Sequence, residues 1–418
     1  KMKDSGIEWI GEIPEEWKTI KFNALYDLRN QKVSDRDFPP LSVTKNGIVP
    51  QLSSAAKTND GDNRKLVKVG DFAINSRSDR RGSCGISKYE GSVSLINTVL
   101  RPINNEMNPD YYNLLFHTFE FADEFYKWGH GIVDDLWTTN WQDMKNITLV
   151  YPSKKEQDRI ASVLNKKVKQ INQTSKTIQQ EIDALEEYRK SLITETVTKG
   201  LDKTVSMKDS GIEWIGEIPE NWKVEKLKYL VETRESKILL SDVQYNYIGL
   251  ENIEKNIGKY ISTDSTYENQ YYNFCEKGDI LYSKLRPNLS KAIIAPFAAC
   301  CTGEFEVIKS TKLHKKYILY YLLSNYVTDA TSAAIYGTKM PRVSWNYVKN
   351  LRVVFPNQSE DQIKIVNYLD KKLTIIDQIV RQKQQQLNHL DKYKQSIVYE
   401  YVTGKKQVSE KEGVKNAQ

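Results

Sequence analysis

Two long stretches of the chain carry apolar residues at alternating spacings of four and three. In the stretch between Pro152 and Gly200 these positions are Leu164, Val168, Ile171, Ile178, Ile182, Leu185, Leu192 and Thr196, with Ser175 and Arg189 in the remaining places. The same pattern returns 205 residues later at Leu369, Leu373, Ile376, Val380, Leu387, Leu390, Ile397 and Tyr401, with Lys383 and Lys394 between them. Such a heptad pattern is typical of a coiled coil. The sequence therefore predicts two copies of one long helix.

The limits of both helices are marked by local signals. Ser153 and Glu156 follow Pro152, and Asn357 and Glu360 follow Pro356, so each copy is predicted to begin with a capping box. Each copy ends at a glycine, which can take a left-handed cap conformation. Helices of roughly 45 residues, about 68 Å long, result. A narrow apolar stripe on so long a helix needs a partner, so we expect the copies to pair; the alternative is a solvated helix with incidental periodicity.

The whole chain is a twofold repeat. Residues 2–15 recur without change at 207–220, and Trp17-Lys18 recurs as Trp222-Lys223. The repeats cover roughly residues 2–203 and 207–405, and each consists of this start motif, a middle region and a long helix. The start motif is rich in isoleucine and tryptophan, so we expect it to pack as core or against the end of a long helix.

The middle regions, about residues 20–150 and 224–355, hardly resemble each other; we call them the first insert and the second insert. Each alternates short strand-like runs with glycine and asparagine turns, followed by a helical stretch at Pro109 to Trp128 or Lys315 to Ala330. Each is predicted to be a compact mixed α/β domain. Two different inserts in one repeated frame indicate that the chain recognises two different targets.

Composition limits the classes of function. The 418 residues include 61 lysines and arginines against 54 acidic residues, a net charge of +7 that is compatible with a polyanionic partner. An apolar run of 18 residues does not occur, so a cytoplasmic protein without membrane contact is expected. Cys84, Cys275, Cys300 and Cys301 have no metal-ligand spacing and are predicted to be buried free thiols.

Motifs for catalysis are missing from the sequence. It contains no G-x-x-x-x-G-K-[ST] phosphate loop, no glycine-rich dinucleotide loop after a strand, and no Asn-Pro-Pro-aromatic or Asp-Pro-Pro-aromatic motif for holding a flipped base. We therefore expect no catalytic activity, no metal and no cofactor in this chain itself.

Cationic loops are the candidate binding sites. Each insert has a Gly-Asp pair, a strand and then a basic loop, at residues 70–83 and 278–288. A second loop precedes the last strand of each insert, at residues 129–139 and 336–345. Arginine can bind guanine or phosphate, and hydroxyl groups can reach either. The predicted DNA-binding residues are Ser76, Arg77, Arg80, Arg81, Ser283, Lys284, Arg286, Thr338, Lys339 and Arg342. The alternative for each is a solvated charged turn.

Four motifs together resemble the specificity subunit of a bacterial Type I restriction-modification system. They are the Gly-Ile-Glu-Trp-Ile-Gly-Glu-Ile-Pro-Glu-x-Trp start, Gly-Asp-Ile-Leu-Tyr-Ser-Lys-Leu-Arg-Pro at 278–287, Gly-Thr-Lys-Met-Pro-Arg at 337–342 and Pro-x-x-x-Glu-Gln-x-x-Ile at 152–160. The second helix departs from the last motif, because Asp361 is inserted before Gln362.

This resemblance implies an α+β protein with internal two-fold pseudo-symmetry. Residues 1–151 and 201–355 would be target recognition domains, each reading one half of a bipartite site in double-stranded DNA. Residues 152–200 and 356–404 would be spacer helices that pair as an antiparallel coiled coil, and 405–418 a disordered tail. Two methyltransferase (modification) subunits would dock on the helices and restriction subunits would join them. S-adenosylmethionine, ATP and Mg²⁺ would belong to those partners.

Two other functions stay open at this point. One is a stand-alone DNA enzyme, and the other is a coiled-coil scaffold that joins two protein-binding domains and has no salt-dependent DNA affinity. The specificity function further predicts that adding or removing residues near Thr194 to Lys199 changes the unread gap and neither half-sequence. The bases themselves are not predictable, because they depend on loop geometry and DNA shape.

Overall fold

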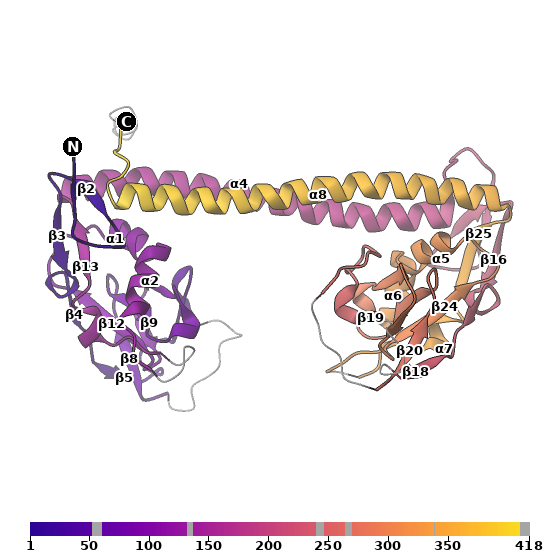
Figure 1. Ribbon diagram of the computed structural model, residues 1–418, viewed down its shortest axis with the longest axis horizontal. Helices are drawn as coiled ribbons and strands as arrows, with labels where there is room; N and C mark the ends of the chain where they lie inside the picture. Colours follow the sequence, from indigo (N-terminus) through magenta and orange to yellow (C-terminus); the bar gives the residue numbers. More distant parts are fainter. Residues whose placement is uncertain (52–60, 132–136, 240–245, 264–269, 338, 410–418) are drawn as a thin grey trace. The chain divides into compact units, whose positions relative to one another are not determined.

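The computed structural model describes residues 1–51, 61–131, 137–239, 246–263, 270–337 and 339–409. These residues form two compact units, Lys1–Ile178 with Gln385–Gln418 (unit 1) and Gln179–Gln384 (unit 2). Each unit contains one insert, one start motif and segments of both long helices (Figure 1).

The two predicted long helices are confirmed as α4 (Lys154–Lys199) and α8 (Ser359–Val402). In unit 2, Glu181 pairs with Lys383 and Arg189 with Asp377, so the partner number falls as the residue number rises and the helices run antiparallel. All of the predicted seam positions are buried or partly buried. In unit 1, Leu164 and Ile171 of α4 share a buried core with Ile397 and Tyr401 of α8, so the predicted pairing of the helices is confirmed in both units.

Unit 1 is built from short antiparallel strands. A hairpin of β1 (Met2–Asp4) and β2 (Glu12–Pro14) is followed by β3 (Lys18–Lys21), which pairs with β13 (Thr148–Tyr151). The central sheet has the order β10 (Cys84–Ile86), β9 (Phe72–Asn75), β12 (Asn97–Pro102) and β4 (Tyr26–Leu28). The others are β11 (Gly91–Val93) with β8 (Arg64–Val67) and β5 (Lys32–Val33), and the pair β6 (Leu41–Thr44) and β7 (Gly47–Pro50).

Unit 2 repeats this plan with a second four-stranded sheet. Its hairpin is β14 (Met207–Asp209) and β15 (Glu217–Pro219), and β16 (Trp222–Lys226) pairs with β25 (Arg352–Pro356). One sheet has the order β17 (Val231–Thr233), β24 (Phe305–Ser310), β21 (Ile280–Ser283) and β22 (Ala292–Ile294). The other has the order β18 (Lys237–Leu239), β20 (Tyr271–Cys275), β23 (Ala299–Cys301) and β19 (Asn246–Ile248), and only its β19–β23 pair is parallel among these described strands.

Each helical stretch predicted in an insert is two helices. In the first insert these are α1 (Pro109–Phe116) and α2 (Phe119–Lys127), and in the second α5 (Lys315–Leu322) and α6 (Asn325–Ala333). The break in the first insert has a clear cause: the Thr118 hydroxyl accepts a hydrogen bond from the Phe121 amide at 3.2 Å and caps a new helix. The short helices α3 (Trp141–Met144) and α7 (Trp345–Val348) precede the last strand of each insert.

Both start motifs pack beside the end of a long helix that belongs to the other repeat. In unit 1, Tyr399 near the end of α8 donates its hydroxyl to the Trp9 carbonyl at 2.9 Å. In unit 2, Val197 near the end of α4 shares one buried core with Ile212 and Trp222. The predicted docking of the start motif against a helix end is thus confirmed, with the partners exchanged between repeats.

Two equivalent tyrosines tie each insert to the same helix end. Tyr111 of α1 donates its hydroxyl to the carbonyl of Val402 at 2.7 Å, and Tyr317 of α5 donates to the carbonyl of Val197 at 2.9 Å. All four residues are fully buried. Each unit therefore needs helical residues from both repeats.

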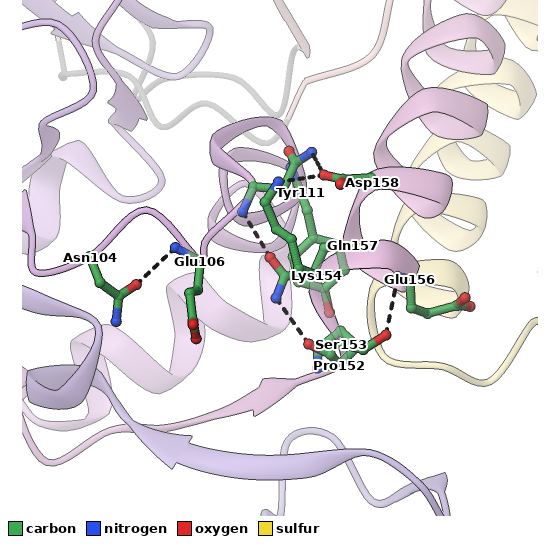
Figure 2. A network of polar contacts seen from close by, with 10 residues as sticks. Asn104, Glu106, Tyr111, Pro152, Ser153, Lys154, Glu156, Gln157 and Asp158 are labelled. Atoms are coloured by element: carbon green, nitrogen blue, oxygen red, sulfur yellow. Dashed lines mark hydrogen bonds and ion pairs between the residues drawn. The ribbon is translucent and has the colours of Figure 1, made fainter.

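The start of α4 is joined to the first insert through a buried glutamine (Figure 2). Gln157 accepts a hydrogen bond from the Asn108 amide at 2.8 Å and donates to the Pro152 carbonyl at 2.9 Å. Gln362 makes the same two contacts at the start of α8, with the amide of His314 and the carbonyl of Pro356. These glutamines are part of the motif that the sequence singled out, and their role here is structural.

The two capping boxes are formed only in part. The Ser153 hydroxyl accepts from the Glu156 amide at 3.3 Å, as predicted (Figure 2). If Asn357 were the N-cap, the second helix would begin at residue 358. Helix α8 begins one residue later, at Ser359. The extra residue Asp361 explains this shift, because it keeps Gln362 in its place while lengthening the connection from Pro356.

The chain keeps its contacts with unit 1 beyond Gly404. The Lys405 ammonium group donates to the Ile10 carbonyl at 2.6 Å, and Val408 is buried. This differs from the predicted disordered tail for residues 405–409, because Val408 supplies an apolar contact; residues 410–418 lie outside the described residues. The four cysteines are buried free thiols, as predicted.

Candidate nucleic-acid interface

The two candidate loops of the first insert lie against each other in unit 1. Arg77 and Thr138 form an antiparallel bridge, and the Ser78 amide donates to the Trp137 carbonyl at 3.0 Å. A third contact joins the Thr139 amide to the Ser76 carbonyl at 3.0 Å. We call this combined surface, residues 76–83 with the described part of 129–139, the first loop surface.

The second insert brings its two loops together in the same way. Leu285 and Arg342 form an antiparallel bridge, the Arg286 amide donates to the Pro341 carbonyl at 2.8 Å, and the Val343 amide donates to the Lys284 carbonyl at 2.9 Å. Residues 283–290 with the described part of 336–343 form the second loop surface. In both inserts, candidate segments more than 45 residues apart in sequence thus build one surface.

Carboxylates partly neutralise the arginines of the first loop surface. The Arg77 guanidinium lies 3.3 Å from Asp79, and Arg80, whose side chain is 69% exposed, lies 3.7 Å from the same carboxylate. Arg81 pairs with Asp123 and stacks over the ring of Tyr126 at 5.9 Å. All three predicted arginines remain accessible, but Asp79 and Asp123 set their positions.

Both predicted serines are buried. The Ser76 hydroxyl lies 2.9 Å from the Thr98 hydroxyl, and the Ser283 hydroxyl donates to the Leu285 carbonyl at 2.9 Å. Their relative exposures are 5% and 2%. In this structure these hydroxyl groups stabilise the loops through hydrogen bonds in the protein interior.

Arg342 and Lys284 are held by carboxylates of the neighbouring strand and turn. Arg342 makes a bidentate contact with Glu304, at 3.1 Å from Nε to Oε2 and 2.6 Å from Nη2 to Oε1. These hydrogen bonds, together with the charge of Glu304, raise the pKa of Arg342. Lys284 lies 3.1 Å from Glu306 and is mostly covered.

Arg286 has a different environment from the other cations. It is exposed and adopts a left-handed backbone conformation with φ of 48°. A turn of 3-10 helix, Pro287–Leu289, follows, and Ser290 is again left-handed with φ of 44°. Two left-handed non-glycine residues cost about 1–3 kcal/mol each, and such strain clusters at binding sites. Lys339 is also exposed, whereas Thr338 lies outside the described residues, as do residues 132–136 of the first loop surface.

The Gly-Asp pairs before the basic loops are structural. Asp71 pairs with Arg29 at 2.5 Å and accepts from the Lys68 amide at 2.8 Å. Asp279 pairs with Arg234 at 2.8 Å and accepts from the Glu276 amide at 2.9 Å. These buried aspartates fix the turns that lead into β9 and β21, and so fix where each basic loop begins.

The described residues hold no group of three or more His, Cys, Asp or Glu side chains that could bind a metal ion. Among the described helices, none combines the length and apolar character needed to cross a membrane. The two loop surfaces instead offer guanidinium, ammonium and backbone groups, which can bind phosphates and base edges.

Comparison with known proteins gives one family. The model described as Type I restriction modification DNA specificity domain matches residues 14–184 and 219–389. The chain is 24% identical over 424 residues to the Type I restriction enzyme MjaVIII specificity subunit of Methanocaldococcus jannaschii, covering 94% of this chain and 93% of the relative. It is also 24% identical over 421 residues to the Type I restriction enzyme EcoDI specificity subunit of Escherichia coli, covering 93% and 88%.

Solved structures share the fold. A chain from a study of complex assembly and conformational transition of the type I R-M system has a TM-score of 0.69 at 12% identity, covering 93% of this chain and 98% of its own. The HsdS subunit from Thermoanaerobacter tengcongensis has a TM-score of 0.50 at 15% identity, covering 94% and 98%. At these identities the likeness concerns the fold alone.

Proposed function

The chain belongs to the Type I restriction-modification DNA specificity family, and from this premise we propose that its two inserts read the two halves of one bipartite site in double-stranded DNA. As a specificity subunit it is a non-catalytic member of a Type I restriction-modification complex. Under the proposal each insert uses its own loop surface, and the two halves differ in sequence because the inserts differ.

One observation carries this proposal. Two inserts with little sequence in common both bring a basic loop and a second, distant loop together by the same backbone contacts, at Arg77 with Thr138 and Leu285 with Arg342. A shared frame with different exposed side chains is what reading two different half-sites requires. The proposed direct contacts with DNA are the exposed residues Arg80, Arg286 and Lys339. We propose that DNA is also contacted by Arg77, Arg81, Lys284 and Arg342, each of which would either leave its carboxylate partner or bind the carboxylate and the DNA together.

The long helices are proposed to set the unread gap and to dock two modification subunits. A restriction subunit would join this assembly in the cytoplasm. S-adenosylmethionine, ATP and Mg²⁺ would be bound by those partners, so methylation and cleavage would occur outside this chain.

A genome-wide map of adenine methylation tests the proposal. Cells expressing this chain with its modification subunit are compared with cells expressing the modification subunit alone. The expected result is a split motif with a fixed gap that appears only when this chain is present. Replacing residues 224–355 by the corresponding insert of another family member should then change one half of the motif.

Two outcomes would contradict the proposal. If the proteins co-purify and no new motif appears, the chain acts as a scaffold between two protein-binding domains instead. If replacing the second insert changes both halves of the motif, the assignment of one half-site to each insert is wrong.

A further inference from the structure

Two aspartates one heptad apart on α8 connect this helix to the second insert. Asp370 accepts hydrogen bonds from the Lys316 ammonium group and the Tyr320 hydroxyl, both at 2.5 Å. Asp377 accepts from Lys259 of the second insert and also pairs with Arg189 of α4. Residues seven apart lie on nearly the same face of a helix. The second insert thus makes ionic contacts with α8 at two successive levels.

The contact at Asp377 is part of a buried charge network. The Asp377 side chain is 9% exposed and that of Arg189 6%, whereas Lys259 is 45% exposed. Burial alone would raise the pKa of Asp377, but hydrogen bonds and charge from Lys259 and Arg189 lower it. The carboxylate is therefore ionised and shared between the neighbouring helix and the insert.

Apolar packing is incomplete beside this network. A cavity of about 130 Å³ lies between the turn at residues 254–257 of the second insert and the helix residues Arg189, Ile376 and Val380. The Nε atom of Arg189 is buried and has no hydrogen-bond partner among the described residues. Beside this cavity, the ion pair of Lys259 with Asp377 is a direct contact between this part of the second insert and α8.

The equivalent positions of α4 carry neutral side chains. Asn165 and Asn172 stand 205 residues before Asp370 and Asp377. Asn165 donates to Asp110 at 3.0 Å, and Asp110 occupies the second position of α1, as Lys316 does in α5. An insert with an acidic residue at this place would meet like charge at Asp370, which is unfavourable. The helix residue and the insert residue are therefore matched within each unit.

We propose that Asp370 and Asp377 are positioning residues that fix the second insert on α8 and so hold the spacing between the two half-sites. The inference rests on the proposed function, because spacing has a meaning only if both inserts read DNA. Without the two lysine contacts the side of the second insert around Lys259 would be held less firmly on α8, whereas Tyr317 and the buried core would still anchor the other side. Sites with a gap one base pair shorter or longer would then be methylated.

The test removes the contacts from the insert side, where both lysines are nearly half exposed. The variant Lys259→Gln with Lys316→Gln leaves Asp377 paired with Arg189. Methylation by the complex with the modification subunit is measured on DNA with the same half-sites and three gap lengths. The ratio of wrong-gap to correct-gap methylation is expected to rise by about tenfold, as for the loss of two partly exposed ion pairs.

A matched control removes the same charge from the long helices without touching the insert or the pairing of the helices. Lys364 pairs with Asp361 within α8 and Lys190 with Glu187 within α4, so Lys364→Gln with Lys190→Gln should keep the gap as strict as in the unchanged chain. Lys259→Arg with Lys316→Arg should restore a strict gap. A uniform fall of methylation at every gap length, or an unchanged ratio, would overturn the positioning role. If the unchanged chain directs no split motif at all, the proposed function fails instead.

Discussion

Arg286 is the predicted DNA-binding arginine with the fewest competing groups around its side chain. Among the described residues it makes no ion pair, whereas Arg77, Arg81 and Arg342 each lie beside a carboxylate. An arginine without a competing carboxylate can offer its whole donor fork to a guanine or a phosphate.

Replacing Arg286 by alanine should weaken recognition of one half-site. The expected loss is about 1–3 kcal/mol if Arg286 binds a base, with relaxed specificity at one position of the motif. Methylation of DNA libraries randomised in that half-site measures both effects. Arg101→Ala is the control, because Arg101 is also exposed but pairs with Asp27 away from the loops. An unchanged motif and rate for Arg286→Ala would remove this residue from the interface.

His117 gives the protein a predictable response to acid. Burial lowers the pKa of this imidazole below its ordinary value of 6.5, although it lies 2.6 Å from the Asn113 carbonyl. The unfolded chain therefore binds a proton at a pH where the folded chain does not. The contribution of neutral, buried His117 to the free energy of unfolding is therefore complete above pH 6.5 and is lost as the pH falls below this value.

The measurement is the thermal unfolding midpoint between about pH 5.5 and pH 7.5. The unchanged chain should lose more stability over this range than the variant His117→Asn, which does not titrate. Parallel curves for the two proteins would show that His117 makes no contribution.

Whether the role of a residue could be predicted from the sequence depends on where its side-chain partners lie along the chain. The basic loops could be found from Arg77, Arg80 and Arg286 alone, since their residue types stand together in the sequence. The neutralising Asp123 and Glu304 could not, because they reach the loops from other parts of the fold. The burial of Ser76 likewise depends on Thr98 in a neighbouring strand.

At the scale of elements, the end of α8 is closely fitted to the first start motif. Gly404 has φ of 77°, and a Cβ atom there would lie 2.4 Å from Cδ of Pro14. Only glycine meets both conditions without a shift of the hairpin.

Gly404→Ala should therefore lower the free energy of unfolding by about 1–3 kcal/mol. Chemical denaturation of the full chain measures this loss. Gly303→Ala is the matched control, since a Cβ atom there meets nothing within 4 Å and its φ is not positive. Equal stabilities of the two variants would contradict the close fit.

The long helices were the most predictable elements, because an apolar heptad pattern sustained over about 40 residues is the mark of a paired helix. The short helices were less so: the pattern predicted one helix from Pro109 to Trp128, whereas Thr118 caps a second helix. A threonine inside an apolar helical stretch acts as a cap only if the neighbouring turn packs accordingly, and that depends on tertiary contacts.

At the scale of the whole molecule, the place where helix length can be changed is restricted. The sequence suggested the stretch from Thr194 to Lys199, but Val197 accepts from Tyr317 and the Thr194 hydroxyl accepts from the Asn325 amide. An insertion there would disrupt unit 2. The exposed residues Gln179 in α4 and Gln384 in α8 make no such contact with an insert in the described structure and are better sites.

Inserting one heptad after Gln179 and one after Gln384 should lengthen the unread gap and leave both half-sequences unchanged. Seven residues add about 10 Å of helix, which is the length of about three base pairs. Methylation mapping gives the new gap directly. An altered half-sequence would show that the helices contribute to base reading, whereas an unchanged gap would show that they are not the spacer. An insertion after Lys199 should instead abolish methylation at every gap length.

The repeat in the sequence predicted two similar parts, and the chain forms two units, but the exchange of helix ends between repeats was not predictable. Nothing in the identical start motifs tells which copy of the helix each will meet. That choice depends on the connection lengths and on the antiparallel pairing of α4 and α8.

Because of this exchange, the end of each repeat lies beside the beginning of the other repeat. Lys405 contacts Ile10 directly, and Val197 near the end of α4 shares a core with Ile212. Residues 200–206 link the repeats at one of these two places, and residues 405 and 2 occupy the equivalent positions at the other. A circularly permuted gene that joins the present ends and begins at Met207 would encode the same two units in the opposite order, and its product should read the same DNA.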